Sequence, residues 1–166
     1  METIIRAATQ PDLEQIYDLI HSAFQSEAEP DLVRRLICDG QALINFLAES
    51  SVCIVGSVVV SPIVMEPDIG LFCGAIAPLS VLPERQSSGI GSKLMRAAIS
   101  ESRKIGIDAL FLLGDPNYYR KFNFTVSSVM NDYSVENFQE LELTKGCLVD
   151  VDSRVKYSNA FSCSER

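Results

Sequence analysis

Hydrophobic positions in the first forty residues follow the periods of one strand and two helices. The run Ile4–Ala7 is typical of a short strand. Apolar residues within Leu13–Phe24 recur every three or four positions, which predicts a helix with one face toward a core. The pattern breaks over Gln25–Pro30, and a second short helix is expected over residues 31–39. Gly40 follows at the usual place for a helix C-terminus.

The pattern changes to a β type over residues 42–82. Three segments rich in β-branched residues, 42–49, 52–65 and 70–82, are separated by turn residues and should form antiparallel strands. A helical period returns over residues 88–104. The apolar positions of this helix, expected to face the sheet, are Ile90, Leu94, Ala97 and Ala98.

A fully apolar run at residues 109–113 is typical of a strand buried between helices. Because a helix connects it to the preceding strand, the two strands should pair in parallel. A short helix is expected over residues 116–121, with Asp115 as its cap. From Phe124 onward the sequence predicts only short strand-like or irregular segments.

Composition indicates one domain over residues 1–166. The chain is 47% hydrophobic, which suffices for a substantial core, and no stretch has the composition of a linker. No apolar run is long enough to cross a bilayer, and the N-terminus lacks the features of a secretion signal, so a cytoplasmic protein without a membrane partner is expected. The net charge of −8 argues against a nucleic-acid partner and is compatible with an amine substrate.

Cysteine and histidine usage argues against a metal site. The chain has no C-x-x-C pair and a single histidine, His21, in a helical pattern. A cysteine–histidine nucleophilic pair would therefore need His21, which is better explained as a surface or packed residue. Cys73 is interpreted as a small core hydrophobe. The five cysteines are Cys38, Cys53, Cys73, Cys147 and Cys163.

The segment Leu79–Ser92 carries the clearest chemical signal. An apolar strand passes through a short polar turn into a helix that glycines open. Backbone N–H groups at a helix start lack partners inside the helix and, with the helix dipole, favour an anion. Small side chains leave that backbone accessible to a diphosphate. An ordinary strand–turn–helix, with glycines serving only turn geometry, is the alternative explanation.

Spacing separates this turn from other nucleotide-binding loops. A P-loop needs G-x-x-x-x-G-K-[ST], but Gly91 is followed by Ser92 and then Lys93. A dinucleotide fingerprint needs a third glycine where Leu94 stands. The pattern that does fit is [QR]-x-x-G-x-[GA] after V-x-P, which resembles the acyl-CoA pyrophosphate loop of the GNAT superfamily of N-acyltransferases. The residues that match are Val81, Pro83, Gln86, Gly89 and Gly91.

A second block extends the resemblance, and the order of predicted elements is similar over nearly the whole chain. The segment 114–124 is similar to the family's Y-x-x-x-G-F motif and to a branch of small predicted acetyltransferases with D-P-x-Y-Y. Tyr119 and Phe124 match, whereas Asn123 replaces the usual glycine and Ser87 replaces a frequent glycine of the turn. Asparagine tolerates a left-handed backbone well, and Ser87 retains its N–H, so neither departure is disabling.

The resemblance implies an α/β (α+β) fold: a mixed, mostly antiparallel sheet flanked by helices, with a parallel strand pair that splays at the acyl-CoA site. It further implies transfer of an acetyl or other acyl group from acetyl-CoA to a primary amine by direct attack in a ternary complex. Pantetheine would pair with the backbone of residues 79–81, and the backbone N–H of Leu79 would stabilise the oxyanion. The implied acyl-CoA-binding residues are Leu79, Ser80, Val81, Gln86, Ser87, Ser88, Gly89, Ile90, Gly91 and Ser92.

Tyr119 matches the family's usual acid for the departing thiolate. Its alternative role is packing under the sheet, and Tyr118 provides the natural comparison. No single general base emerges, and each candidate is also explained as a surface carboxylate. The candidates are Glu27, Glu29, Glu66 and Asp68.

Other functions remain open at this stage. A module that binds acyl-CoA without turnover would need a structural Tyr119, and a protein-interaction module would need an occluded turn at Ser87. The acceptor amine, the acyl chain and the choice between monomer and homodimer are not defined by the sequence, because acceptor pockets in such folds are built from the first helices and late loops.

Overall fold

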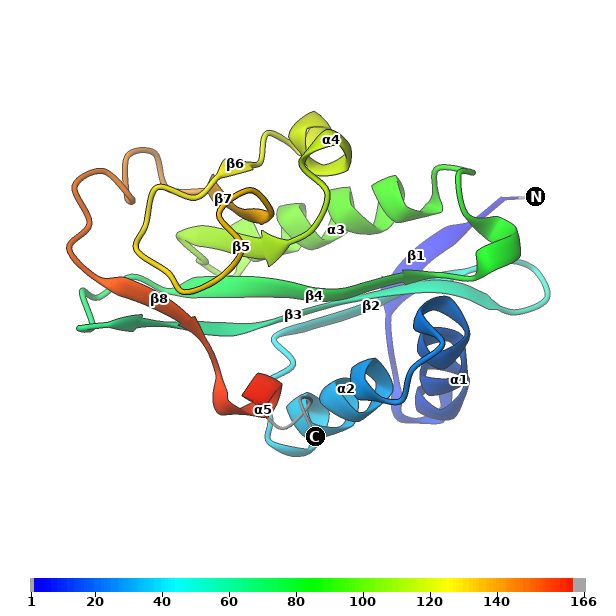
Figure 1. Ribbon diagram of the computed structural model, residues 1–166. Coiled ribbons are helices and arrows are strands. Elements are labelled where there is room, and N and C mark those ends of the chain that lie inside the picture. The colour runs from blue at the N-terminus through cyan, green and yellow to red at the C-terminus, as the bar shows by residue number, and fades with distance from the viewer. Residues whose placement is uncertain (1, 163–166) are drawn as a thin grey trace.

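The computed structural model describes residues 2–162, in which eight strands form one twisted sheet (Figure 1). The strand order is β1-β2-β3-β4-β5-β7-β6, and β8 pairs with the far part of β3. The strands are β1 Ile4–Ala7, β2 Ile44–Glu49, β3 Ile54–Glu66, β4 Cys73–Val81, β5 Ala109–Leu113, β6 Thr125–Val126, β7 Phe138–Glu142 and β8 Arg154–Tyr157. The helices are α1 Leu13–Phe24, α2 Ala28–Cys38, α3 Ile90–Lys104, α4 Pro116–Tyr119 and α5 Asn159–Ser162.

Pairing is antiparallel throughout the sheet except between β4 and β5. These two strands pair in parallel over three positions only, from Cys73 opposite Ala109 to Ala75 opposite Phe111. Beyond Ala75 the ladder ends, although β4 continues to Val81 along β3. The predicted mixed sheet with a splayed parallel pair is therefore confirmed.

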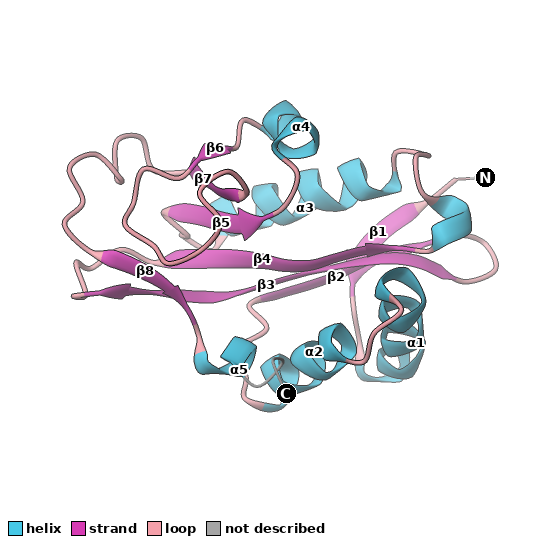
Figure 2. Ribbon diagram, in the orientation of Figure 1, coloured by secondary structure: helices cyan, strands magenta, loops and turns pink. Residues whose placement is uncertain are grey.

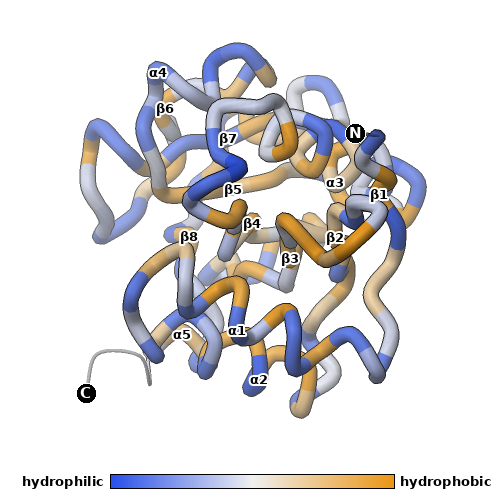
Figure 3. Tube along the Cα trace, turned by 90° about the vertical axis from the view of Figure 1, so that its right-hand side faces the viewer, coloured by the Kyte–Doolittle hydropathy of each residue, from blue (hydrophilic) through white to orange (hydrophobic). Residues whose placement is uncertain are grey.

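Helices cover both faces of the sheet (Figure 2). One face packs under α1 and α2, with Ile16, Ile20 and Leu36 fully buried. The other face packs under α3. Figure 3 shows hydrophobic residues concentrated along the inner strands and polar residues along the outer loops. The sheet is thus the shared floor of two cores, as expected for strands that are hydrophobic on both sides.

The apolar face of α3 follows its predicted period with one change. Ile90, Leu94 and Ala98 are buried as expected. Ala97 is only half-buried, and Met95 is fully buried in its place. The buried stripe is therefore rotated slightly about the helix axis relative to the prediction.

The start of α2 differs from the prediction. Pro30 was expected to belong to a break before a helix at Asp31, yet the helix begins at Ala28. A proline in the first turn is tolerated because N–H groups there have no acceptor inside the helix. The earlier start places Glu29 in the first turn of α2.

Strand ends and the C-terminal third also depart from the sequence prediction. The three central strands begin two or three residues later than expected, and the helix expected over 116–121 is α4 followed by a 3-10 turn at Arg120–Phe122. Of the strand-like segments after Phe124, only two lie in β7 and β8; Tyr133–Val135 and Cys147–Val151 are loops and turns. Four residues of these loops pack into a third hydrophobic cluster around Phe111 and Phe138, a role that periodicity does not reveal: Tyr133, Cys147, Leu148 and Val151.

No helix within residues 2–162 combines the length and apolar character that a membrane span requires.

Arg6 on β1 ties the first strand to the turn before α1. Its guanidinium donates to both oxygens of Asp12, at 2.8 and 2.9 Å, and to Glu49 on β2 at 3.0 Å. The hydrogen bonds from Arg6 hold the pKa of the Asp12 carboxyl well below its usual range. A bidentate pair of this kind is a geometry in which an ion pair contributes to stability.

We expect Asp12→Asn to lower the free energy of unfolding by about 1 kcal/mol at neutral pH. Because the pKa of Asp12 is lowered by folding, its contribution is complete above the unfolded pKa of about 3.9 and is lost as the pH falls below it. Urea midpoints at pH 7 and pH 3 measure this difference. Asp31→Asn, which removes the exposed i,i+3 pair with Arg34, serves as the control and should have little effect. An equal loss for both variants would contradict the assignment.

Candidate active site

The unpaired part of β4 forms an open strand edge. The N–H of Leu82 donates to the carbonyl of Val55 on β3 at 3.0 Å. Successive N–H groups of a strand point to opposite edges, so Ser80 also faces β3. The N–H groups of Leu79 and Val81 therefore face the side that β5 has left, where Gln86 Nε2 donates to the carbonyl of Val81 at 3.2 Å. Two donors are thus available on this edge for a ligand that pairs like a strand.

The turn between β4 and α3 keeps its backbone accessible at the helix start. Gly89 has φ +86°, and a Cβ there would meet nothing within 4 Å. Gly91 gives space to a neighbour, because a Cβ there would lie 2.7 Å from the Tyr118 hydroxyl and would require that side chain to shift. Ser87 adopts φ +58° in the position where the family often has glycine, and the Ser88 hydroxyl donates to the carbonyl of Arg85 and braces the turn.

A cavity of 410 Å³ lies over this turn. Two positively charged side chains that were not predicted as site residues line it: Arg85 from the turn and Lys121 from the segment after α4. Tyr118 also lines it, with the ammonium of Lys121 4.1 Å from its ring centre. Of the expected acyl-CoA residues, the cavity is lined by Leu79, Val81, Gln86, Ser87, Gly89, Gly91 and Ser92.

Three expected residues lie elsewhere. The side chain of Ile90 is buried in the core under α3, and Ser80 is buried at a position paired with Ser57 of β3. Ser88 is exposed and engaged with Arg85. These residues shape the turn and the strand, and none of their side chains lines the cavity.

A second cavity, of 510 Å³, lies on the other side of the open edge. Its floor is the β4 segment 76–79, and Leu79 lines both cavities. Helices α1 and α2 supply Phe24, Glu29 and Leu32. Aromatic residues from later segments complete the wall: Tyr119, Tyr133, Tyr157 and Phe161. The two spaces therefore meet at a strand edge with a free backbone donor.

Tyr119 lines the second cavity together with Leu79 and is held in place by its surroundings. The Asp115 carboxylate caps α4 by accepting the N–H of Asn117 at 2.9 Å, as predicted. The ring packs edge-on against Phe124, and the absent side chain of Gly114 makes room for it. Burial raises the pKa of Tyr119 to about 12. Its phenol therefore keeps its proton at neutral pH and can act as a donor.

The two neighbouring tyrosines face different spaces. Tyr118 lines the cavity over the turn, and Tyr119 lines the cavity beyond Leu79. Their rings meet edge-on with centres 4.9 Å apart. Substitution of each tyrosine in turn therefore tests one cavity at a time.

Only one of the four candidate bases lines the second cavity. Glu29 does so, and its Oε2 is enclosed without a hydrogen-bond partner. Glu27 lies 2.7 Å from His21, and Glu66 lies 2.7 Å from Lys156 on β8. Asp68 accepts the N–H of Gly70 in a turn. The last three carboxylates are therefore engaged on the surface or in a turn.

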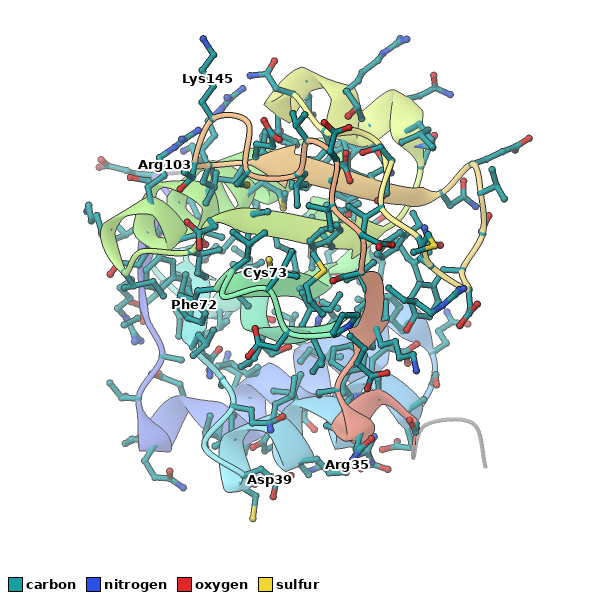
Figure 4. The ribbon with its side chains drawn as sticks, turned by 90° about the vertical axis from the view of Figure 1, so that its left-hand side faces the viewer. Arg35, Asp39, Phe72, Cys73, Arg103 and Lys145 are labelled. Carbon is teal, nitrogen blue, oxygen red and sulfur yellow. The ribbon has the colours of Figure 1, made fainter. Side chains whose placement is uncertain are left out.

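Two of the four cysteines in the described part of the chain, Cys73 and Cys147, are unsuited to nucleophilic chemistry. Burial raises the pKa of Cys73 to about 12 and that of Cys147 to about 11. Figure 4 shows Cys73 beside Phe72 at the start of β4, in the middle layer of the molecule. Cys163 lies outside the described residues. Within residues 2–162, no group of three His, Cys, Asp or Glu side chains is arranged to hold a metal ion.

An open parallel strand pair beside a glycine-opened helix is the arrangement expected for an N-acyltransferase that uses a CoA thioester. Comparison with known families agrees: residues 13–124 match the acetyltransferase (GNAT) family. The chain belongs to this family, and its class of enzyme is an acyltransferase.

Relatives from Escherichia coli support the same assignment. The uncharacterized N-acetyltransferase YjhQ of strain K12 is 30% identical over 116 residues, which are 68% of this chain and 64% of YjhQ. The uncharacterized N-acetyltransferase YhbS is 28% identical over 126 residues, or 75% of each chain. The chain thus matches just under two thirds of the length of YjhQ.

Two solved structures share the complete architecture. The crystal structure of YhbS from E. coli in complex with CoA aligns with a TM-score of 0.91 at 26% identity, covering 96% of this chain and 92% of YhbS. A GNAT family acetyltransferase from Brucella melitensis in complex with acetyl-CoA aligns with a TM-score of 0.82 at 29% identity, covering 96% and 98% of the two chains.

Proposed function

We propose that this protein transfers an acetyl group from acetyl-CoA to a primary amine by direct attack within a ternary complex. The observation that carries the proposal is the position of Leu79, which lines both cavities on an unpaired strand edge. A thioester bound from one side would present its carbonyl to an amine bound from the other. The proposed location is the cytoplasm, and the proposed assembly is a monomer or a homodimer.

The cavity over the turn is suited to the diphosphate of CoA. The first N–H groups of α3 have no acceptors within the helix, and the 15-residue helix directs its positive dipole end to the same place. Arg85 and Lys121 add positive charge. The bound CoA and acetyl-CoA in the YhbS and Brucella structures support this use of the fold.

The open edge of β4 is suited to the pantetheine arm and the thioester. The N–H of Val81 and its carbonyl would pair with the amides of pantetheine, displacing the Gln86 side chain from that carbonyl. The N–H of Leu79 would then donate to the oxyanion of the tetrahedral intermediate. Such a donor contributes on the order of 3 kcal/mol to transition-state stabilisation in other enzymes.

The reaction needs no reactant other than acetyl-CoA and the amine. The ammonium group of the amine first releases one proton to solvent. The neutral nitrogen then attacks the thioester carbon, and the carbon–sulfur bond breaks as the amide forms. Tyr119 donates its phenolic proton to the departing sulfur, and the proton lost by the nitrogen replaces it. The products are the N-acetylated amine and CoA with a free thiol.

A module that binds acyl-CoA without turnover remains the alternative, and a protein-interaction module is the second. The unobstructed turn argues against the interaction module, because Gly89 has open space around it. The cavity beyond Leu79 argues against a non-catalytic binder, because CoA alone would not require it.

Initial rates test the proposal. CoA release is measured while acetyl-CoA and an amine are each varied, with amines drawn from monoamines, amino acids, polyamines and lysine peptides. Lines that intersect in double-reciprocal plots are expected for a ternary complex. Parallel lines would indicate a covalent acetyl-enzyme, and acetyl-CoA binding without release would favour the binding module.

Gly114→Ala should lower kcat at least about tenfold, because the added methyl group would collide with the Tyr119 ring and displace its hydroxyl. The measurement is steady-state kinetics in the parent and in a Tyr119→Phe background. If Gly114 acts by positioning Tyr119, the alanine costs little more in that background. Full, additive losses in both backgrounds would mean that the methyl group disturbs something other than Tyr119.

A further inference from the structure

The cavity beyond Leu79 has an aromatic wall assembled from distant segments. Tyr157 stands at its centre, with ring centres 5.0 Å from Tyr133 and 4.6 Å from Phe161. Phe24 closes the α1 side. The wall is also fixed in place, since Arg35 Nε of α2 donates to the carbonyl of Ala160 in α5 at 3.0 Å. Figure 1 shows α5 beside α2 at this side of the sheet.

Glu29 is the only charged side chain among the residues between 2 and 162 that line this cavity. The carboxylates on either side of it in the sequence are paired, Glu27 with His21 at 2.7 Å and Asp31 with Arg34 at 2.8 Å. In contrast, Glu29 Oε2 is enclosed and has no hydrogen-bond partner. An enclosed carboxylate oxygen without a donor is costly, and rotation of the carboxylate toward the cavity that Glu29 lines would let a cationic ligand remove that cost.

The volume of this cavity limits the size of the ligand that it can bind. A volume of 510 Å³ lies within the usual range for small-molecule sites. The acetyl end of the thioester must occupy part of it, because Leu79 lines both cavities. The remaining space suits a compact body, and its lining offers aromatic rings for an apolar group and for cation–π contact.

Given the function proposed above, on which this step rests, we propose that the acceptor is a primary amine with a single positive charge on a compact apolar body, such as an arylalkylamine. Glu29 binds the ammonium group and the rings of Phe24, Tyr157 and Phe161 hold the body. A polyamine would bring further charges to a cavity with one carboxylate, and an amino sugar would leave its hydroxyls against aromatic rings. Glu29 is thus a specificity-determining residue of the acceptor site.

Binding of 2-phenylethylamine to the protein saturated with CoA tests this inference without relying on turnover. Calorimetry is carried out with 2-phenylethylamine, the neutral 2-phenylethanol, spermidine and glucosamine. We expect 2-phenylethylamine to bind at least about tenfold more tightly than each of the others. Preference for spermidine, glucosamine or the neutral alcohol would overturn the inference.

Two variants with matched controls locate the effect. Glu29→Gln, which keeps the shape and removes the charge, should weaken 2-phenylethylamine binding at least about tenfold and leave CoA binding unchanged. Glu27→Gln, whose parent carboxylate pairs with His21 outside the cavity, should change neither. Phe24→Ala should weaken binding of the amine in proportion to the apolar contact it loses. Equal affinity in Glu29→Gln and the parent would overturn the role of Glu29.

Different results would contradict the proposed acceptor class and the proposed transfer reaction. Acetylation of spermidine or a lysine peptide, with no binding of 2-phenylethylamine, would leave the acetyltransferase function intact and overturn the proposed acceptor class. Tight, Glu29-dependent binding of 2-phenylethylamine with no acetylation of any amine would support the site and contradict the transfer reaction.

Discussion

Replacement of Tyr119 by phenylalanine is expected to lower kcat at least about a hundredfold. The variant keeps the ring that packs against Phe124 and removes only the hydroxyl. Burial raises the pKa of this hydroxyl to about 12, so the parent enzyme holds a protonated donor over the whole neutral range. Without it the thiolate must leave unassisted. The KM for acetyl-CoA and the unfolding temperature should stay close to those of the parent.

Tyr118→Phe is the matched control for this result. Tyr118 is next in sequence and also aromatic, but it lines the cavity over the turn and its hydroxyl lies close to Gly91. Its loss should change the KM for acetyl-CoA by a few fold and leave kcat within a few fold of the parent. A kcat for Tyr119→Phe as high as that for Tyr118→Phe would contradict the assignment of Tyr119 as the acid.

Gly89→Glu is expected to abolish stabilisation of the protein by acetyl-CoA. A ligand present at a hundred times its dissociation constant adds about 2.7 kcal/mol to the free energy of unfolding. The new carboxylate would stand where the diphosphate binds, at the positive end of α3, and would repel it. The measurement is the shift in unfolding temperature on addition of acetyl-CoA, compared with each variant's own ligand-free value.

A glutamate at Gly89 also strains the backbone, because the residue has φ +86°. Gly106→Glu controls for this strain: Gly106 follows the other end of α3, has φ +87°, and likewise has open space around a Cβ. This control should be destabilised to a similar extent and still respond to acetyl-CoA. If both variants lost the response, or if Gly89→Glu kept it, the turn would not be the diphosphate site.

Local sequence was sufficient to predict the nucleotide side of the site. The glycines, the small residues and the strand before them are contiguous, so the turn and the start of α3 follow from short-range geometry. The parallel pairing of β4 with β5 was predictable as well, because a strand–helix–strand unit favours it, whereas the open edge was expected only from the family resemblance. The roles of the cationic side chains Arg85 and Lys121 were not predicted, although both residues lie within the two matching segments.

The acceptor side could not be predicted because no local pattern encodes it. Its wall combines α1, α2, β4, the loop at Tyr133 and the C-terminal segment, which are brought together only by the folded sheet. The sequence prediction placed Glu29 outside the helix because Pro30 was interpreted as part of the break before it. In the structure Pro30 lies in the first turn of α2, and Glu29 lies there as well. Charge and spacing alone left Glu29 equivalent to Glu27.

The departures from the family pattern have a physical explanation in the backbone. Asn123 has φ +71° and Ser87 has φ +58°, so both stand at left-handed positions where glycine is most favourable. Asparagine adopts this conformation at low cost, as expected from the sequence. For Ser87 the cost is of order 1 kcal/mol, and the residue nevertheless lines the cavity over the turn.

Direct acetyl transfer from acetyl-CoA to an amine is tested most directly by mass spectrometry with acetyl-CoA that carries a deuterated acetyl group. The protein, labelled acetyl-CoA and an accepted amine are mixed, and samples are quenched within and after the first turnover. We predict that the label appears on the amine nitrogen at the same rate as free CoA and never on the protein. Label on the protein before the amide forms, or CoA release without an acetylated amine, would contradict the account.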